Sequence, residues 1–265
     1  PLFLFYNKLY HRKIHYVVIG GWLDSFLDEH KWLVRLLKKF DAIYVESDMM
    51  KSALQRRGFE NAVVMYNFKE LEPLAESDIE YPKSEPYKLC TFSRVMKEKG
   101  IEDAINAVES VNAHFGRTVY TLDIFGQVDV EYKERFSQLE KSFPDYISYG
   151  GAIEANKSIE TLKSYFALLF PTYYKGEGFA GTLIDAMSAG VPVIASDWKY
   201  NSEFVVPGKT GVIIENCNAE RLAEELINIA AAPEKWNSMR LSALKESEKY
   251  KPDIAARPLI DRING

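Results

Sequence analysis

Short apolar runs alternate with longer amphipathic stretches along most of the chain. The runs, such as residues 120–125 and 193–196, are rich in β-branched and aromatic residues, a composition typical of buried strands. The stretches between them carry apolar residues three and four positions apart, as at Ile101, Ala104 and Ile105, which is the spacing of one helix face. Strands and helices that alternate in this way favour parallel sheets joined by crossover helices. The pattern therefore predicts an α/β fold.

The expected strands form two series, and the first lies within residues 1–70. Apolar runs there predict strands at 14–19, 42–46 and 62–66. Three strands are too few for a doubly wound domain, which is built from two βαβαβ halves. We therefore expect this first domain to be incomplete in the chain. Residues 71–87 are rich in Pro, Glu and Ser, show hardly any periodicity and are typical of a linker.

The second series begins after the linker and predicts a full α/β domain over residues 88–250. Helical stretches separate its apolar runs, and the last long helix is expected to start near Ala219. The six expected strands cover residues 89–93, 120–125, 146–149, 167–170, 193–196 and 212–214.

Composition and charge narrow the class of protein without identifying it. The 265 residues are 47% hydrophobic and 27% charged, with a formal net charge of −5, which is ordinary for a globular protein. No uninterrupted apolar run reaches the roughly 18 residues of a membrane span, and the opening lacks the pattern of a secretory signal. We therefore expect a cytoplasmic protein. Cys90 and Cys217 lie far apart in apolar runs, which favours two buried free thiols over a disulfide or a metal pair.

The first candidate site follows the strand expected at 89–93. Ser93, Arg94 and Lys99 lie in a short segment that joins the carboxyl end of this strand to the next helix. Ligands of open parallel sheets bind at that edge, and arginine and lysine form strong charge-assisted bonds to phosphate. The segment therefore predicts a phosphate site, and the alternative is a connecting loop that merely happens to be basic.

The second candidate segment runs from Lys175 into a helix that is expected to start near Thr182. Its glycines let a ligand approach the backbone, and the unpaired amides at a helix start form an anion site. Glu177 lies in the loop and Asp185 about one turn into the helix. Two carboxylates at this spacing suit hydroxyl groups at the two ends of a nucleotide sugar. For Asp185, the alternative is a solvated charge on the helix surface.

The same segment partly matches the dinucleotide-binding fingerprint. Gly176, Gly178 and Gly181 have the required spacing, and Asp197 follows the next strand at about the expected distance. In that fingerprint, however, the strand leads directly into the first glycine, whereas residues 171–175 intervene here. The match also lies late in its domain rather than in the first strand-to-helix turn. This context argues against a nicotinamide or flavin enzyme.

Taken together, these motifs closely resemble glycosyltransferase family 4, whose members are retaining enzymes of the two-domain GT-B type. The resemblance implies two Rossmann-like domains: an acceptor-side domain whose last part is residues 1–70, and a nucleotide-sugar-binding domain at 88–250. It also implies that residues 251–265 form a closing helix that packs back toward the first domain. The pieces that carry the resemblance are Arg94 with Lys99, Glu177 with Asp185, the segment 189–197, Glu203 and the segment 208–211.

The resemblance also implies a role for each site residue. Arg94 and Lys99 would hold the donor diphosphate, and Glu177 would face the donor sugar near the reacting carbon. Asp185 would bind the ribose hydroxyls, although the family usually has the longer Glu at this position. The remaining donor-binding positions would be Ser93, Gly178, Phe179, Ala180, Gly181 and Thr182.

The implied activity is transfer of a hexose-type sugar from a nucleotide sugar to a glycan or lipid-linked acceptor, with retention of configuration. No convincing Asp-x-Asp motif ends a strand, so we expect neither a metal nor another cofactor. No nucleic-acid partner is expected. The alternatives are a sugar-nucleotide epimerase of similar architecture and a non-catalytic module that binds sugar nucleotides.

A weaker prediction concerns the membrane. Residues 31–40 mix cations with apolar groups, and such a helix can rest on an anionic membrane that bears a lipid-linked acceptor. The protein would then act at the inner face of the membrane. The alternative is a helix that packs on the core with a solvated basic face.

Overall fold

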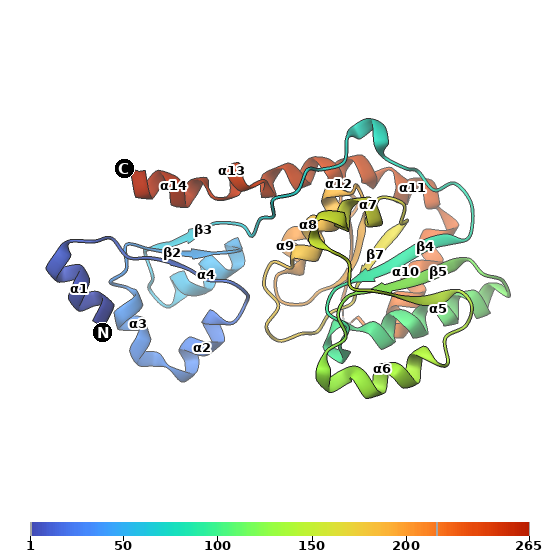
Figure 1. Cartoon of the computed structure of the whole chain (residues 1–265), viewed down its shortest axis with the longest axis horizontal. Helices are drawn as coiled ribbons and strands as arrows, with labels where there is room; N and C mark the ends of the chain where they lie inside the picture. Colours follow the sequence, from blue (N-terminus) through green and yellow to red (C-terminus); the bar gives the residue numbers. More distant parts are fainter. Residues whose placement is uncertain (1, 216, 265) are drawn as a thin grey trace. The chain divides into compact units, whose positions relative to one another are not determined.

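A computed structural model describes residues 2–215 and 217–264, and the chain divides into two compact units. The first unit comprises Pro1–Glu70, Lys175–Gly181 and Lys249–Gly265, and the second comprises Leu71–Tyr174 and Thr182–Glu248. Each unit contains its own parallel sheet, which confirms the α/β fold class (Figure 1). The units differ from the sequence-based division in that the loop Lys175–Gly181 belongs to the first unit, and residues 71–87, expected as a linker, belong to the second.

The first unit is built on a three-stranded parallel sheet in the order β1-β2-β3. Its buried core includes Ala42, Tyr44 and Met65, and Leu259 from the last helix packs against them. The elements of this unit are β1 (His15–Val17), β2 (Ala42–Val45), β3 (Ala62–Val64), α1 (Leu2–Tyr10), α2 (Leu23–Glu29), α3 (Lys31–Leu37), α4 (Asp48–Arg56), α13 (Pro252–Ala255) and α14 (Arg257–Asn264).

The second unit is built on a six-stranded parallel sheet in the order β6-β5-β4-β7-β8-β9. Its strands are β4 (Tyr87–Phe92), β5 (Tyr120–Phe125), β6 (Ile147–Gly151), β7 (Ala167–Phe170), β8 (Val193–Ser196) and β9 (Gly211–Ile214). Its helices are α5 (Ile101–Phe115), α6 (Lys133–Glu140), α7 (Ser158–Leu162), α8 (Gly181–Ser188), α9 (Asn201–Phe204), α10 (Ala219–Ala231), α11 (Pro233–Asn237) and α12 (Met239–Ser247).

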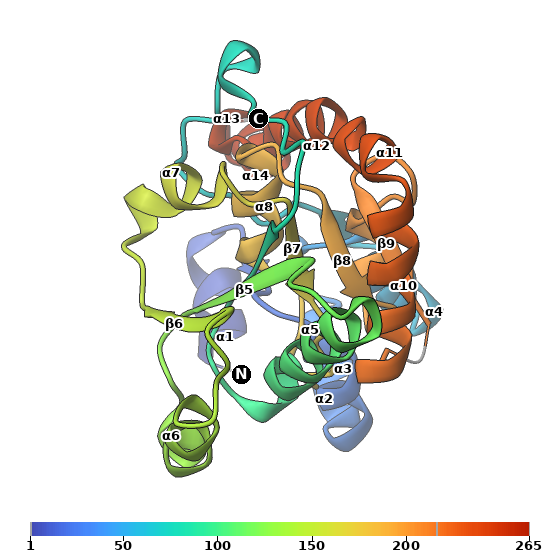
Figure 2. The ribbon, with the colours of Figure 1, turned by 90° about the vertical axis from the view of Figure 1, so that its right-hand side faces the viewer.

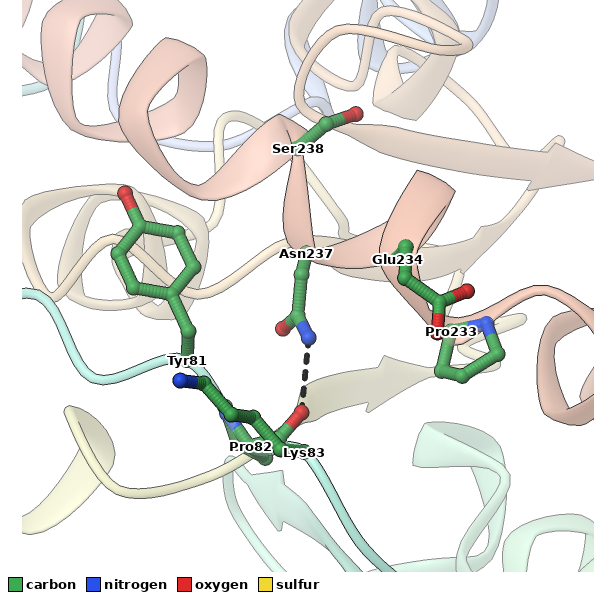
Figure 3. A pocket seen from close by; sticks show the side chains of 7 residues that line it. All are labelled: Tyr81, Pro82, Lys83, Pro233, Glu234, Asn237 and Ser238. Carbon is green, nitrogen blue, oxygen red and sulfur yellow. Dashed lines mark hydrogen bonds between the residues drawn. The ribbon is translucent and has the colours of Figure 1, made fainter.

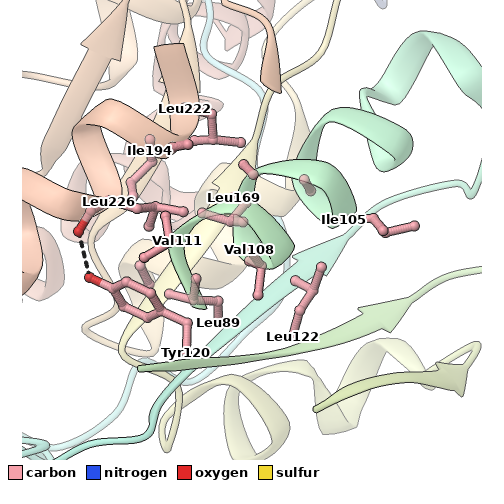
Figure 4. Packing of buried hydrophobic residues seen from close by; sticks show 14 of the residues in the cluster. Leu89, Ile105, Val108, Val111, Tyr120, Leu122, Leu169, Ile194, Leu222 and Leu226 are labelled. Atoms are coloured by element: carbon pink, nitrogen blue, oxygen red, sulfur yellow. Dashed lines mark hydrogen bonds between the residues drawn. The ribbon is translucent and has the colours of Figure 1, made fainter. Parts of the chain in front are cut away.

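The main core of the second unit lies where α5 and α10 cover one face of this sheet (Figure 2). Val108 of α5 and Leu222 of α10 are fully buried in one cluster with strand residues such as Leu89 and Ile194 (Figure 4). The Tyr120 hydroxyl donates a 2.9 Å hydrogen bond to the carbonyl of Leu226, so α10 is also fixed to β5 by a polar contact. This packing holds the strands whose carboxyl ends carry the candidate site.

The strand order reverses at the centre of this sheet. From β4 the chain continues to β5 and β6 on one side, whereas β7, β8 and β9 extend on the other. In open parallel sheets, ligands bind in the crevice at such a switch point, outside the carboxyl ends of the two central strands. Both candidate segments follow those strands, since the loop 93–100 follows β4 and the loop 171–180 follows β7.

Two sequence expectations concern the thiols and membrane spans. Both cysteines are free, as expected, and Cys90 is buried; Cys217, which was also expected to be buried, is only half-buried. Within the part of the chain that the structure describes, no helix has both the length and the apolar character needed to cross a membrane.

Candidate active site

The loops that follow β4 and β7 are in direct contact at the carboxyl edge of the second sheet. The carbonyl of Glu98 accepts hydrogen bonds from the Tyr173 amide at 2.8 Å and from the Thr172 hydroxyl at 3.2 Å. A Cβ atom added to Gly100, whose φ is +70°, would lie only 2.3 Å from the carbonyl oxygen of Pro171. This close approach requires glycine and fixes the first basic segment beside the second loop.

Lys99 lies at this contact between the two loops. Its ammonium nitrogen is 5.4 Å from the centroid of the Phe170 ring and 5.2 Å from that of Tyr174. Cations at this distance are attracted by the negative faces of aromatic rings. The two rings therefore hold the Lys99 charge near the carboxyl end of β7.

Arg94 lies in the same loop as Lys99, the loop that follows β4, and is next to the loop that follows β5. Its guanidinium is 3.7 Å from the Asp129 carboxylate, and the side chain is 60% exposed. An exposed ion pair of this kind contributes little stability, so the arginine can exchange this carboxylate for a phosphate. Arg94 and residues 127–130 line a hollow of about 380 Å³.

Backbone contacts fix the Arg94 segment against that neighbouring loop. The Val95 amide donates to the Gln127 carbonyl, and the Asp129 amide donates to the Val95 carbonyl, both at 2.9 Å. A Cβ atom on Gly126, whose φ is +138°, would lie 1.7 Å from the Ser93 carbonyl oxygen. Ser93 therefore contributes a tightly packed backbone, and its hydroxyl donates to the carbonyl of Arg94 at 3.3 Å.

The start of α8 carries a buried hydroxyl without a partner. Thr182 is 9% exposed, and among the described residues its Oγ1 makes no hydrogen bond. The first amides of a helix also lack intrahelical acceptors, and together they form a positive site for anions. Because an unpaired buried hydroxyl costs free energy, this atom points to a ligand as its partner.

Asp185 is fixed within the second unit and is not a solvated helix charge. Its side chain is 1% exposed, and Oδ1 accepts a 2.9 Å hydrogen bond from the hydroxyl of Ser158 at the start of α7. This excludes the surface-charge alternative. Its assignment to the ribose hydroxyls stays a prediction.

The loop with Glu177 lies in the first unit together with a second buried carboxylate, Glu46. Both side chains are 5% exposed. Oε2 of Glu46 accepts hydrogen bonds from the amides of Phe179 and Gly20, each at 3.1 Å. Burial raises the pKa of Glu46; the two amide bonds oppose this shift, and the charge of Glu177 adds to it.

Sequence reasoning did not identify Glu46 or the other groups that hold this loop. The carbonyl of Phe179 accepts a 2.9 Å hydrogen bond from Asn67 Nδ2, and its ring meets the Tyr250 ring edge-on at 4.6 Å between centroids. The side chain of Lys69 lies over Gly181, since a Cβ atom there would be 2.8 Å from Lys69 Cε. These partners are distant in sequence; the one local signal was a Glu that ends the apolar run 42–46.

The predicted site residues thus fall into two groups. The second unit brings Ser93, Arg94 and Lys99 to the same sheet edge as the start of α8, which carries Thr182, with Asp185 one turn further along the helix. The first unit holds the loop residues Glu177, Gly178, Phe179, half-buried Ala180 and Gly181. No group of three or more His, Cys, Asp or Glu side chains that could hold a metal occurs among the described residues.

A different hollow, of about 470 Å³, lies beside the segment that leads into the amino end of β4 (Figure 3). Asn237 Nδ2 donates a 2.8 Å hydrogen bond to the Pro82 carbonyl in this hollow. The charged side chains that line it, Lys83 and Glu234, are exposed. It therefore lacks the buried charged groups found near the carboxyl edge.

Comparisons with known proteins identify the family to which the chain belongs. Residues 75–246 match the family described as Glycosyl transferases group 1. The UDP-N-acetylglucosamine–peptide N-acetylglucosaminyltransferase GtfA subunit of Streptococcus gordonii is 30% identical over 178 residues, which are 64% of this chain and 34% of that protein. The chain spans between 34% and 50% of the length of three curated relatives.

Two solved structures illustrate the likeness of the fold. Anabaena Alr3699/HepE in complex with UDP has a TM-score of 0.80 at 16% identity, over 97% of this chain and 74% of that one. A point mutant of S. aureus TarM in complex with Fondaparinux, alpha-GlcNAc-glycerol and UDP has a TM-score of 0.74 at 19% identity, over 96% of this chain and 51% of that one. The chain has the GT-B type of α/β fold and belongs to the group 1 glycosyltransferases.

Proposed function

We propose that this protein transfers a hexose-type sugar from a nucleotide-sugar donor to a glycan or lipid-linked acceptor with retention of configuration, as an enzyme of family 4. The observation that carries the proposal is the meeting of two loops at the switch point of the second sheet. Arg94 and Lys99 lie in one loop, and the other leads to the helix start with the Thr182 hydroxyl, which has no partner among the residues that the structure describes. Two cations and a helix start suit a diphosphate.

The relatives support a nucleotide sugar as the donor. HepE and TarM were solved with UDP, and the streptococcal relative is named as a UDP-N-acetylglucosamine-dependent transferase. For this chain we propose the same class of donor. Arg94, Lys99 and the start of α8 supply the positive charge that a departing diphosphate needs, so no metal is required in this scheme.

The two carboxylates take different roles in this scheme. Glu177, buried in its loop, faces the donor sugar, where a carboxylate orients hydroxyl groups and stabilises positive charge at the reacting carbon. Asp185, held by Ser158, binds the ribose. Ser93 and residues 178–182 contribute mainly backbone groups.

The test is turnover by variants of the two cations. Each fixed charge that stabilises the transition state is worth about 2.7 to 4 kcal/mol, so Arg94→Ala and Lys99→Ala should each lower kcat/KM for the donor by roughly a hundredfold or more. Lys97→Ala is the matched control, because Lys97 is an exposed cation of the same loop. Donors are found by incubating the protein with a panel of nucleotide sugars and acceptors and reading products by mass spectrometry.

The outcomes separate this proposal from its alternatives. Arg94→Ala with kcat/KM near wild type contradicts it. A nucleotide sugar that changes its sugar without any acceptor, while the nucleotide stays attached, indicates an epimerase. Saturable binding without turnover indicates a binding module.

We also propose that the protein works at the inner face of a membrane. The support is α3, on which Lys31, Trp32 and Arg35 are exposed, with Trp32 at 59%. Leu37, at the end of the same helix, is buried. A cationic, partly aromatic exposed face is suited to anionic lipid headgroups.

A further inference from the structure

Glu46 is a buried carboxylate at the end of an otherwise apolar strand. All four residues of β2 are buried, and Glu46 follows them directly with 5% exposure. A carboxylate in such surroundings loses its hydration, and it persists only where hydrogen bonds compensate. The contacts of Glu46 therefore indicate what it does.

The contacts of Glu46 go to the backbone of two loops. Oε2 accepts from the amide of Gly20, which follows β1, and from the amide of Phe179 in the loop 175–181. The Gly21 amide also approaches the carbonyl of Gly176 at 3.4 Å. One carboxylate oxygen thus joins the ends of β1 and β2 to the loop that carries Glu177.

The fit between Glu46 and this loop depends on glycine at position 178. A Cβ atom on Gly178 would lie 2.3 Å from Glu46 Oε2 and 2.6 Å from Gly20 Cα. Contacts this short do not occur, so any side chain at 178 would push the loop away from Glu46. The observed geometry of the loop and its hydrogen bond to Glu46 therefore depend on each other.

Phe179 is held on several sides. Its amide donates to Glu46, its carbonyl accepts from Asn67, and its ring packs edge-on against Tyr250. Glu177 precedes it by two residues and is close enough for its charge to raise the pKa of Glu46. Two like charges near each other repel, so a buried carboxylate at position 46 beside Glu177 has an electrostatic cost. We expect a function to offset this cost.

We infer that Glu46 is a positioning residue, which fixes the loop 175–181 and thereby the orientation of Glu177 toward the donor sugar. The inference rests on the proposed function for the role of Glu177, whereas the fixing of the loop is independent of it. Reacting groups must be held closely, since a displacement of about 1 Å can cost roughly a hundredfold in rate. Glu46 acts through the backbone and does not itself touch the donor in this scheme.

The experiment compares Glu46→Ala, Glu46→Gln and the control Ser47→Ala. Ser47 is the next residue, is fully buried and caps α4 by accepting from the Met50 amide at 3.0 Å, but it is not bonded to the loop. Glu46→Ala should lower kcat by roughly ten- to a hundredfold. Its affinity for UDP should stay within about twofold of wild type, because Arg94 and Lys99 are unchanged. Glu46→Gln keeps an oxygen that accepts both amides and should retain most of kcat.

A second readout does not need activity. Hydrogen exchange followed by mass spectrometry should show faster exchange in peptides that contain the Phe179 and Gly20 amides in Glu46→Ala. In Ser47→Ala, faster exchange should be confined to the start of α4, with a loss of about 1 kcal/mol in unfolding free energy and kcat near wild type.

Three results would overturn the inference. The first is Glu46→Ala with wild-type kcat and wild-type exchange of the loop. The second is Glu46→Gln as inactive as Glu46→Ala, since the charge itself would then be required. The third is a loss of UDP affinity and thermal stability in proportion to kcat, which marks a general folding defect. If the wild type transfers no sugar, the proposed function fails, and the exchange data still decide whether Glu46 fixes the loop.

Discussion

Glu102 is a residue outside the candidate site whose contribution to stability can be measured through its dependence on pH. It accepts hydrogen bonds from Arg135 and, at 3.0 Å, from the Tyr132 hydroxyl. The bond from Arg135 is the main cause that holds the pKa of Glu102 below its ordinary value of 4.5. These bonds fix the start of α5 to the segment 130–140, which follows β5.

The sign of the pH effect follows from that depressed pKa. The ionised carboxylate stabilises the fold above the unfolded-state pKa, and this contribution disappears as the pH falls through the lower folded-state pKa. Glu102→Gln should therefore melt below wild type at neutral pH, and the gap in Tm should shrink as the pH falls below about 4. Thermal unfolding of both proteins across this range is the measurement. A gap that stays constant with pH would contradict the assignment.

The candidate residues that the sequence pointed to differ in a physical way from those that it did not. Arg94, Lys99 and Thr182 could be proposed from the sequence because each follows a predicted strand, and parallel strands end at one sheet edge. Glu46 could not be proposed in this way, because its acceptor role depends on a backbone amide 133 positions away. No local pattern marks such a contact.

The membrane proposal is tested through the exposed face of α3. Sedimentation with liposomes should increase with the fraction of anionic lipid, and the substitutions Lys31→Glu and Arg35→Glu together should remove most of that increase. Cationic residues near an anionic surface contribute about 1 kcal/mol each. Binding that does not depend on anionic lipid would contradict the proposal and leave α3 as a helix with a solvated basic face.

The strands of the second sheet followed from periodicity, whereas several helices did not, among them α1, α9, α11 and α12. All six strands of the second sheet lie where the apolar runs predicted them. The helix α2 was not predicted, because it is only seven residues long and begins without a capping signal in the sequence. Its N-cap residue is Trp22, whose side chain makes no capping hydrogen bond. Between the strands expected at 120–125 and 146–149, residues 130–132 form a separate turn capped by Asp129, with a hydrogen bond from the Glu131 amide, and α6 begins only at Lys133.

At the scale of the whole molecule, the division into units could not be deduced from chain order. The loop Lys175–Gly181 follows β7 of the second sheet, yet its contacts place it with the first unit. The segment Lys249–Gly265 is also grouped with residues 1–70, and Leu259 packs on that sheet; here the expectation came from the family resemblance and not from chain order. Such assignments depend on packing between distant segments, whereas periodicity reports only on neighbours along the chain.

We propose that a diphosphate binds at the carboxyl edge of the second sheet, between the loops that follow β4 and β7. A crystal structure of the protein with UDP tests this binding site directly. We expect the two phosphates to lie within about 3.5 Å of Arg94 and Lys99 side-chain nitrogens and of the amides at the start of α8. A diphosphate bound elsewhere, for example in the hollow beside Tyr81 and Asn237 (Figure 3), with Arg94 and Lys99 making no contact to it, would contradict the proposed site.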